Sequence, residues 1–257
     1  MENITSPNNE LIKKIKSLKD KKYRKFYGEY LVEGEHMVRE AILTGQNIVC
    51  VVCQTTSYEK FEHTLQPIQN LVKLVPPNLF SQLSETVTPQ GILAILSMRP
   101  SKEFIPYKPF LVLDRLQDPG NLGTIIRTAA ATGFRDIVLL QTVDPFNPKT
   151  VRSSSSGIFF TSFYPMQQEE LLALLQKEHI PLYTADAGGE NIFTFQINEP
   201  VYGLAIGNEA AGPSDELIEA STALVALPML REMESLNAGI SASVLMYLCN
   251  GKNIHNE

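Results

Sequence analysis

The stretch "FLVLDRLQDPGNLGTIIRTAAATGFRDIVLL", residues 110–140, contains a complete strand–helix–strand unit. Its two apolar runs, 110–116 and 136–140, are rich in Val, Ile and Leu and predict buried strands. Between them, residues 121–133 have helical spacing and end at Gly133, a typical helix stop. Two strands joined through a helix usually lie parallel in one sheet. The stretch therefore predicts an α/β fold.

The same alternation extends in both directions from this unit. Further strands are predicted at 47–54, 71–75, 90–98, 181–186, 201–207 and 223–227. Further helices are predicted at 58–70, 77–86, 171–179, 214–220 and 237–250, and residues 30–45 have roughly helical spacing. Three prolines within 99–109 indicate a linker. We therefore expect two α/β domains, residues 1–104 and 105–257, with a mostly parallel sheet covered on both faces.

Composition points to an intracellular chain. The apolar runs are far shorter than the roughly 20 residues that a membrane span needs, and the polar start does not resemble a signal peptide. The three cysteines are an odd number with no disulfide framework, which favours the cytoplasm. Cys50 and Cys53 form a C-x-x-C within an apolar run, but no second pair completes a zinc site. We expect core packing there and no metal.

The charge of the chain is unevenly distributed. The net charge of -6 taken alone argues against a nucleic-acid partner. Residues 11–25, however, hold eight of the 22 basic residues and one acidic residue. Salt screening limits the reach of distant acids to roughly 8–10 Å, so a local basic segment can still bind phosphates. The segment is either such a site or a solvated helix face.

Ligands of open parallel sheets bind beyond the carboxyl ends of the strands, so the turns that follow strands are candidate sites. In the turn at 118–123, Asn121 is a plausible helix N-cap. Arg127 lies in the second turn of an otherwise apolar helix, where it either extends to water or pairs with an anion. The spacing G-N-L-G differs from the G-x-G-x-x-G of dinucleotide-binding enzymes, which disfavours a nucleotide-dependent oxidoreductase.

Two later turns carry further polar residues. Glu209 lies in a glycine-bounded loop, where it is either solvated or functional. Ser235 or Asn237 is a plausible N-cap for the last helix. That helix begins with small residues, which predict close packing against another helix: Ala238, Gly239, Ser241, Ala242 and Ser243.

Taken in order, three segments resemble motifs 1, 2 and 3 of the SpoU (TrmH-type) RNA 2'-O-ribose methyltransferases of the SPOUT superfamily. They are "DPGNLGTIIRTA" (118–129), "AIGNEAAGPSDEL" (205–217) and "LPMLREMESLNAGISASVLMYL" (227–248). The segment "YRKFYGEYLVEGEHMVREAI" (23–42) resembles the substrate-binding domain of many of these enzymes, which is similar to kink-turn-binding ribosomal proteins. This chain departs from the third motif at Arg231, where a glycine is usual.

The resemblance implies a fold, a cofactor and an assembly. Residues 105–257 would form a catalytic α/β domain with a deep trefoil knot that binds S-adenosylmethionine, and residues 1–104 would bind RNA. The enzyme would be a homodimer whose active site draws on both subunits. Position by position, the resemblance assigns the catalytic residues Asn121, Arg127, Glu209, Ser235 and Asn237. It assigns cofactor binding to Ile206, Gly207, Asn208, Leu227, Met229, Ser235 and Leu236.

The chemistry of ribose methylation suggests roles for these residues. A guanidinium stays protonated in proteins, so Arg127 is a poor base. We expect it to hold a substrate phosphate and favour ionisation of the 2'-hydroxyl, with the phosphate or a water accepting the proton. RNA phosphates would contact Lys21, Lys22, Arg24, Lys25 and Arg152. Ribosomal RNA is favoured over transfer RNA, and a non-catalytic RNA-binding protein of the same fold is the main alternative.

Overall fold

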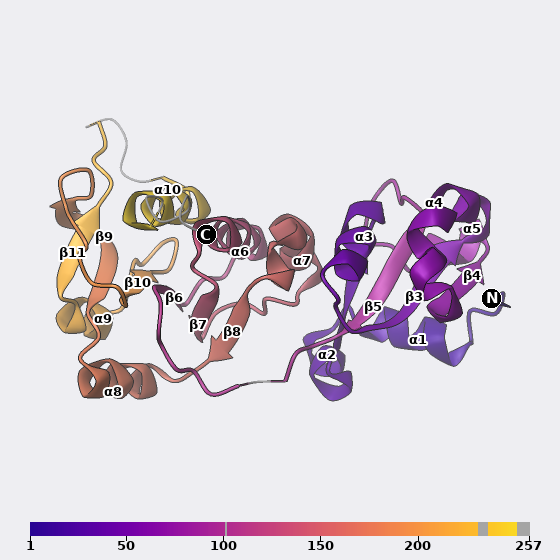
Figure 1. Cartoon of the computed structure of the whole chain (residues 1–257), viewed down its shortest axis with the longest axis horizontal. Coiled ribbons are helices and arrows are strands. Elements are labelled where there is room, and N and C mark those ends of the chain that lie inside the picture. Colours follow the sequence, from indigo (N-terminus) through magenta and orange to yellow (C-terminus); the bar gives the residue numbers. More distant parts are fainter. Residues whose placement is uncertain (101, 231–235, 251–257) are drawn as a thin grey trace. The chain divides into compact units, whose positions relative to one another are not determined.

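The computed structural model describes residues 1–100, 102–230 and 236–250. The chain forms two compact units (Figure 1). The first unit comprises residues 1–100 together with 146–159, and the second comprises 101–145 together with 160–257. The domain boundary between 104 and 105 stays a prediction.

The first unit is built around a mixed five-stranded sheet. In the order β1-β4-β3-β5-β2, the β1–β4 and β3–β4 pairs are parallel, and β5 is antiparallel to both β3 and β2. The strands are β1 (Glu2–Asn3), β2 (Glu29–Glu33), β3 (Ile48–Gln54), β4 (Val72–Val75) and β5 (Ile92–Ser97). The α-helices are α1 (Glu10–Ser17), α2 (Lys21–Tyr27), α3 (Glu35–Leu43), α4 (Tyr58–Leu65), α5 (Pro77–Phe80) and α7 (Pro148–Ser154). Short 3-10 turns are η1 (Thr55–Ser57), η2 (Gln66–Leu71) and η3 (Ser155–Phe159).

The core of this unit follows from residue spacing. Ile12 and Ile15 lie one turn apart in α1, and both are fully buried against the sheet with Leu18. Cys50 and Cys53 are buried in β3, as the apolar run predicts. Burial raises the pKa of the Cys50 thiol to about 11, so the thiol is neutral. These cysteines therefore pack in the core.

The continuous helix expected from the spacing over 30–45 is wrong. Residues 29–33 form β2, and α3 begins only at Glu35. Gly34 lies between them at φ 98°, a conformation that L-residues other than glycine rarely adopt, and it ends the strand. The apolar positions before Gly34 therefore belong to a strand pattern and those after it to a helix pattern. The helix expected over 77–86 also ends early, at Phe80.

The second unit contains a six-stranded sheet, entirely parallel, in the order β11-β9-β10-β6-β7-β8. This confirms the mostly parallel α/β fold. The strands are β6 (Phe110–Asp114), β7 (Asp136–Leu140), β8 (Ser162–Pro165), β9 (Leu182–Asn191), β10 (Gly203–Ile206) and β11 (Ala223–Ala226). The helices are α6 (Pro119–Thr132), α8 (Gln168–Glu178), α9 (Asp215–Ala220) and α10 (Ala238–Asn250).

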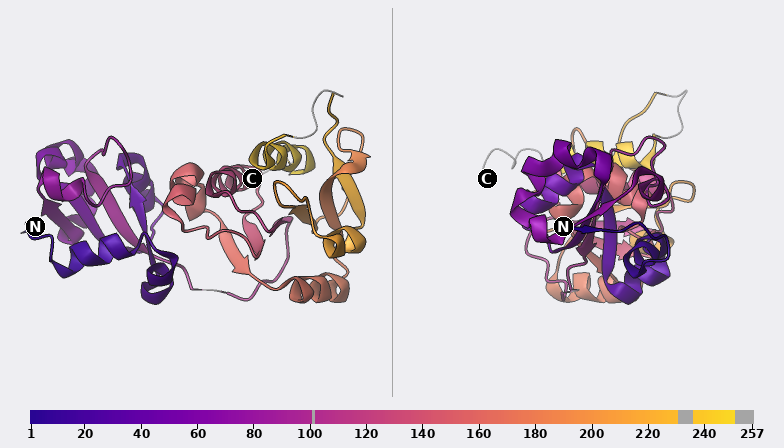
Figure 2. Two further views of the ribbon diagram at one scale, coloured as in Figure 1. Left: turned by 180° about the vertical axis from the view of Figure 1, so that it is seen from behind. Right: turned by 90° about the vertical axis from the view of Figure 1, so that its right-hand side faces the viewer.

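Helices cover both faces of this sheet. Figure 1 and the left view of Figure 2 place α6 and α10 on one side and α8 and α9 on the other. Alternate residues of a strand point to opposite faces, and Phe110 and Val112 of β6 pack with Leu171 and Leu217 of α8 and α9. With both faces covered, the central strands β6 and β10 are buried along their whole length. The trefoil knot stays a prediction.

Two elements carry signals too weak to predict from the sequence. Strand β8 is four residues long and half-buried, at the edge of the sheet. Helix α7 is seven residues long and lies in a polar stretch, "PKTVRSS", with Pro148 in its first turn and Asn147 as its cap. Within the described residues, no helix is both long and apolar enough to cross a membrane.

Candidate active site

Helix α6 begins earlier than its apolar pattern predicts, and this changes the role of Asn121. The N-cap is Asp118, whose carboxylate accepts a hydrogen bond from the backbone amide of Asn121 at 2.8 Å. Pro119 takes the first helical position, which suits its fixed φ and missing N–H. The expectation that Asn121 caps the helix is therefore wrong, and its side chain is available for other contacts.

The side chain of Asn121 joins the three strand-following segments. Its Nδ2 donates to Oε1 of Glu209 at 3.1 Å. Its Oδ1 accepts from Nδ2 of Asn237 at 2.8 Å. Asn237 in turn caps α10, because its Oδ1 accepts from the backbone amides of Gly239 and Ile240. Three of the five expected catalytic residues thus form one hydrogen-bonded chain, Glu209–Asn121–Asn237.

Glu209 accepts hydrogen bonds on both of its carboxylate oxygens. Besides the side-chain amide of Asn121, the backbone amides of Gln117 and Asp118 donate to the Glu209 carboxylate, each at 3.3 Å. Burial raises the pKa of this carboxylate. The hydrogen bonds lower the pKa by a larger amount, so the net pKa is below its ordinary value. A carboxylate stabilised in its charged form is a weak base. Glu209 is suited to hold the turn before α6 rather than to remove a proton.

The loop that carries Glu209 is fixed at its base by a second network. The buried carboxylate of Asp114 accepts from Nε and Nη2 of Arg115 and from the Ser214 amide. Nη2 of Arg115 also donates to the Gly212 carbonyl at 3.3 Å. Arg115 itself sits at φ 56°, which is unusual for a residue with a side chain. The end of β6 and the 208–214 loop are therefore clamped together.

Asn208, one of the residues expected to bind the cofactor, has a structural side chain. Its Nδ2 donates to the Arg115 carbonyl at 2.8 Å, and its Oδ1 accepts from the amides of Ala210 and Ala211. We therefore assign the side chain of Asn208 to holding the loop. Gly207 precedes it at a point where an added Cβ would lie 2.0 Å from the Pro213 nitrogen. Only glycine permits this approach of two backbone segments.

Arg127 lies six positions after Asn121 on the same helix, and its side chain is exposed. No hydrogen bond or ion pair joins it to another residue in the described part of the chain. The structure therefore leaves its guanidinium available to an external anion.

The close helix packing expected for 238–243 is confirmed. An added Cβ on Gly239 would lie 3.3 Å from Cβ of Thr124 and 3.4 Å from Cα of Asn121 in α6. Four residues further along, the hydroxyl groups of Ser243 and Thr128 lie 2.9 Å apart. The small residues of α10 therefore bring its first turn, with Asn237, onto the turn that holds Asn121.

The remaining expected cofactor residues follow β10 and β11, whose carboxyl ends leave the same edge of the parallel sheet. Ile206 and Gly207 are buried at the end of β10. Met229 and Leu236 are exposed by 36% and 41%, so apolar side chains are available to cover the adenosine part of S-adenosylmethionine. Leu227 is half-buried after β11. The assignment of these residues to the cofactor stays a prediction. Ser235 and Arg231 lie outside the described residues.

The residues expected to contact RNA divide into two groups. Lys21, Lys22 and Lys25 are exposed on α2. Arg24 is only 2% exposed, and its Nη1 donates to the carbonyls of Leu18 and Lys19 at 2.9 and 2.7 Å. These are carbonyls that the end of α1 leaves without helical partners. The expected RNA contact of Arg24 is therefore wrong, because the side chain joins α1 to α2.

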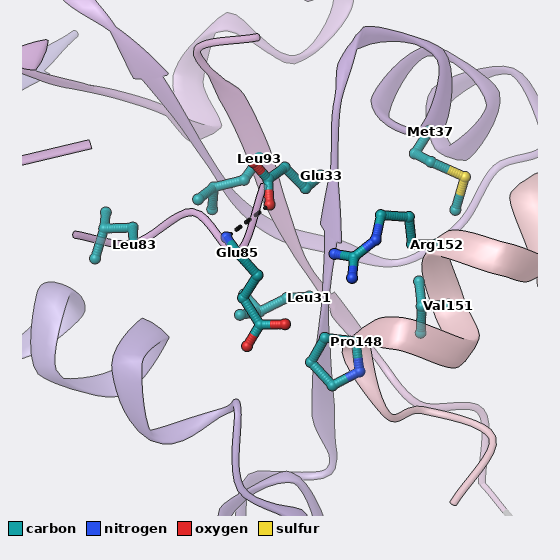
Figure 3. Close-up of a pocket in the computed structure, with 9 residues that line it drawn as sticks. All are labelled: Leu31, Glu33, Met37, Leu83, Glu85, Leu93, Pro148, Val151 and Arg152. Atoms are coloured by element: carbon teal, nitrogen blue, oxygen red, sulfur yellow. Dashed lines mark hydrogen bonds between the residues drawn. The ribbon is translucent and has the colours of Figure 1, made fainter. Parts of the chain in front are cut away.

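Arg152, the fifth expected RNA contact, lies on α7 in the first unit. Its side chain is exposed at the rim of a small pocket between the sheet and α7, also lined by Glu33, Glu85 and Val151 (Figure 3). The pocket volume is about 30 Å³, room for about one water molecule. No described residues form a cluster of metal-ligating side chains.

Comparisons with known proteins agree with this arrangement. Residues 108–247 match the SpoU rRNA Methylase family, and residues 9–94 match an MRM3-like substrate binding domain. The chain is 33% identical to the 23S rRNA (guanosine(2553)-2'-O)-methyltransferase RlmP of Bacillus subtilis, covering 98% of this chain and 100% of that protein. It is 34% identical to an uncharacterized tRNA/rRNA methyltransferase of Synechocystis, covering 95% and 92%.

Solved structures agree as well. An AdoMet-bound rRNA methyltransferase from Sinorhizobium meliloti superposes with a TM-score of 0.84 at 28% identity, covering 96% of both chains. The SpoU methyltransferase AviRb from Streptomyces viridochromogenes, in complex with AdoMet, has a TM-score of 0.84 at 25% identity, covering 96% and 99%. The chain, with the three motif segments joined through Asn121, belongs to the SpoU rRNA methylase family.

Proposed function

We propose that this enzyme transfers a methyl group from S-adenosylmethionine to a ribose 2'-hydroxyl of ribosomal RNA. The observation that carries the proposal is the chain Glu209–Asn121–Asn237, which unites the three motif segments, together with the exposed Arg127 on the same helix as Asn121. The cofactor supplies a methyl group on a sulfonium, which is already a good electrophile. The task left to the protein is to position the ribose and to favour loss of its proton.

Arg127 performs the electrostatic part of this task. Its guanidinium binds the phosphate next to the reacting ribose through two parallel hydrogen bonds, a geometry that lysine cannot reproduce. The positive charge stabilises the developing 2'-oxyanion, and the phosphate or a water takes the proton. Preorganised charge of this kind contributes about 3–4 kcal/mol to many reactions. Bound S-adenosylmethionine would supply the methyl group to the ribose oxygen that Arg127 stabilises.

Asn121 and Asn237 act as positioning residues. They hold each other at 2.8 Å, and Glu209 holds Asn121, so all three side chains are fixed before substrate binds. Fixing reacting groups in advance lowers the entropic part of the barrier. Ser235 is assigned to the same site on the strength of the motif alone.

The enzyme acts as a homodimer through the second unit. The support is the surface of α6 and α10: Ile240 and Tyr247 are each exposed by 52% on α10, and Arg127 and Ala131 are exposed on α6. Exposed apolar side chains that recur at helical spacing favour a partner helix. A two-fold pairing of this surface would bring Arg127 close to the site of the partner subunit.

Ribosomal RNA is favoured as the substrate class because the relative from Bacillus subtilis acts on 23S rRNA and covers the full chain. Transfer RNA is the second candidate, since relatives from Staphylococcus carry the broader description of tRNA/rRNA methyltransferases. The experiment is a map of 2'-O-methylated nucleotides in total RNA from cells with and without the gene. One ribosomal site should disappear on deletion and return with the wild-type gene but not with Arg127→Ala. If a site in transfer RNA disappeared instead, the substrate class would be transfer RNA. If the two maps were identical, methyl transfer would be excluded and only RNA binding would be left as the function.

A further inference from the structure

Helix α2 exposes an aromatic surface that the methyl-transfer site does not use. The side chain of Phe26 is 77% exposed, and those of Tyr23 and Tyr27 are each 40% exposed. Single exposed apolar residues are common, but three in one seven-residue helix form a continuous surface. Figure 1 and the left view of Figure 2 place α2 at the margin of the first unit, beyond the end of α1.

The aromatic side chains lie next to lysines on the same surface. Successive residues of an α-helix are about 100° apart, so Lys21, Lys25 and Lys22 occupy one side of the exposed surface. Phe26, Tyr23 and Tyr27 continue that surface in the same rotational direction. Arg24 is the one residue of α2 that is buried, and it anchors the helix by hydrogen bonds to the end of α1.

The geometry around Phe26 is already ordered. The Tyr27 ring packs edge-on against it, with ring centroids 4.9 Å apart and an angle of 82° between the planes. Nζ of Lys14 lies 5.0 Å from the centroid of Tyr27, and Nζ of Lys22 lies 5.8 Å from the centroid of Tyr23. Each tyrosine thus has a cation near its ring, whereas Phe26 is the most exposed of the three.

The charges around α2 favour an anionic partner. The acids nearby are engaged within the protein: the Asp20 carboxylate caps α2, and Glu29 pairs with Lys14 at 2.7 Å. Lys21 and Lys25 have no ion pair with any residue in the described ranges. An aromatic ring bordered by free lysines suits a ligand that combines flat bases with phosphates.

We propose that Phe26 is a stacking platform for an unpaired base of the RNA substrate, while Lys21, Lys22 and Lys25 bind the flanking phosphates. The proposal rests on the proposed function, because it takes RNA as the partner. It also specifies the RNA: bases of a duplex are already stacked, so the segment bound here is a loop, a bulge or a single strand. Stacking tolerates any base, so this surface adds affinity and leaves the choice of nucleotide to the catalytic unit.

The test compares full-length Phe26→Leu with the wild type. Leucine keeps an apolar side chain and removes the aromatic face. Leu43→Ala is the matched control, because Leu43 is exposed by 71% in the same unit but lies on α3. The probes are unmethylated 23S rRNA transcribed in vitro, an oligouridine single strand and a fully paired RNA hairpin.

Phe26→Leu should weaken binding to 23S rRNA and oligouridine by about 5- to 100-fold, the loss expected for one base stack, and leave hairpin binding unchanged. The salt dependence of RNA binding by Phe26→Leu should match that of the wild type. Lys25→Ala, in contrast, should reduce the slope of log affinity against log salt concentration by about one. Zero-length photo-cross-linking should join Phe26 to a base. Unchanged affinity for both unpaired probes, or an equal loss on the hairpin, would overturn the stacking role.

A methyl-transfer assay distinguishes a failure of this proposal from a failure of the proposed function. Phe26→Leu should raise the KM for 23S rRNA by about the factor by which it weakens binding, because the proposed role of Phe26 is to hold the RNA. A wild-type enzyme that methylates no rRNA, yet cross-links to unpaired bases through Phe26, would refute the proposed function alone. Sedimentation with phosphatidylglycerol vesicles tests the other anionic surface. Vesicle binding that depends on Phe26, with RNA binding unaffected, would assign α2 to a membrane and overturn the RNA proposal.

Discussion

The side-chain amide of Asn121 donates to Oε1 of Glu209 at 3.1 Å, although 88 positions separate the two residues in the chain. The same asparagine accepts from Asn237, a further 28 positions along. One side chain therefore couples the turn after β6, the loop after β10 and the first turn of α10. Under the proposed function, the geometry of the methyl-transfer site depends on this coupling.

Asn121→Asp should reduce kcat by at least about 100-fold. The substitution replaces an amide donor with a carboxylate that faces Glu209, and like charges at hydrogen-bond distance repel. Single-turnover methylation of rRNA measures the loss. Glu209→Gln in the Asn121→Asp background should restore part of the rate, since the new amide can donate to the new carboxylate. A double variant no more active than Asn121→Asp would contradict the coupling.

Glu209→Gln alone distinguishes a positioning role from a general base. We expect a loss of about tenfold in kcat, because glutamine keeps one acceptor oxygen for the three donors that Glu209 serves. If Glu209 were the general base, Glu209→Gln would lose nearly all turnover. The shape of the pH–rate profile is the second readout, and the variant should keep the wild-type dependence near neutral pH.

The stabilising effect of Glu209 should vanish in acid. Burial raises the pKa of this carboxylate, but hydrogen bonds from Asn121 and backbone amides lower it below its ordinary value. A lowered folded-state pKa adds stability above the unfolded-state pKa, and this stability is lost as pH falls through the folded-state pKa. The Tm difference between wild type and Glu209→Gln should persist at neutral pH and disappear below the ordinary carboxylate range. A difference that grows in acid would reverse the sign and contradict the assignment.

Arg127→Lys should lose about 100-fold or more in turnover while keeping the fold and cofactor binding. Lysine retains the charge but not the planar pair of donors that binds a phosphate. Calorimetry with S-adenosylmethionine and single-turnover methylation give the two readouts. Thr124→Ala is the control, an exposed α6 residue one turn before Arg127 whose hydroxyl bonds only within the helix. Near-full turnover of Arg127→Lys would exclude the bidentate role.

Tyr247→Lys should convert the enzyme to monomers. Tyr247 is half exposed on the outer surface of α10, and a lysine there would be buried without a partner in the proposed two-fold interface. Sedimentation equilibrium measures the mass. Phe193→Lys is the control, because Phe193 is exposed by 64% in the same unit but lies away from α6 and α10 in sequence. A wild-type mass for Tyr247→Lys, or a monomeric wild type, would exclude this interface.

The sequence specified most of the fold through short-range signals. In residues 110–140, apolar runs, helical spacing and a final glycine all act over a few positions, so strands β6 and β7 and the helix between them are predictable. The same applies to buried Cys50 and Cys53, whose environment follows from the apolar run around them. The three motif segments likewise name the site residues, although their roles remain proposals.

Other features depend on residues brought from a distance. Asp118 and Asn121 are both good N-cap residues, and local preference does not decide between them. Asp118 caps the helix, which leaves Asn121 to meet Glu209 and Asn237. Arg24 resembles its lysine neighbours in the sequence, yet it is buried because α1 ends with free carbonyls beside it.

The sequence by itself therefore determined the α/β alternation over most of the chain, the apolar cores and the family to which the motifs belong. Only the tertiary structure decided which polar side chains are partners and which remain free for a ligand. The physical reason is range. Backbone preference and hydrophobic period act within one or two turns, whereas a hydrogen bond requires a donor and an acceptor within about 3 Å. In this chain, the fold brings together partners that are up to 118 positions apart.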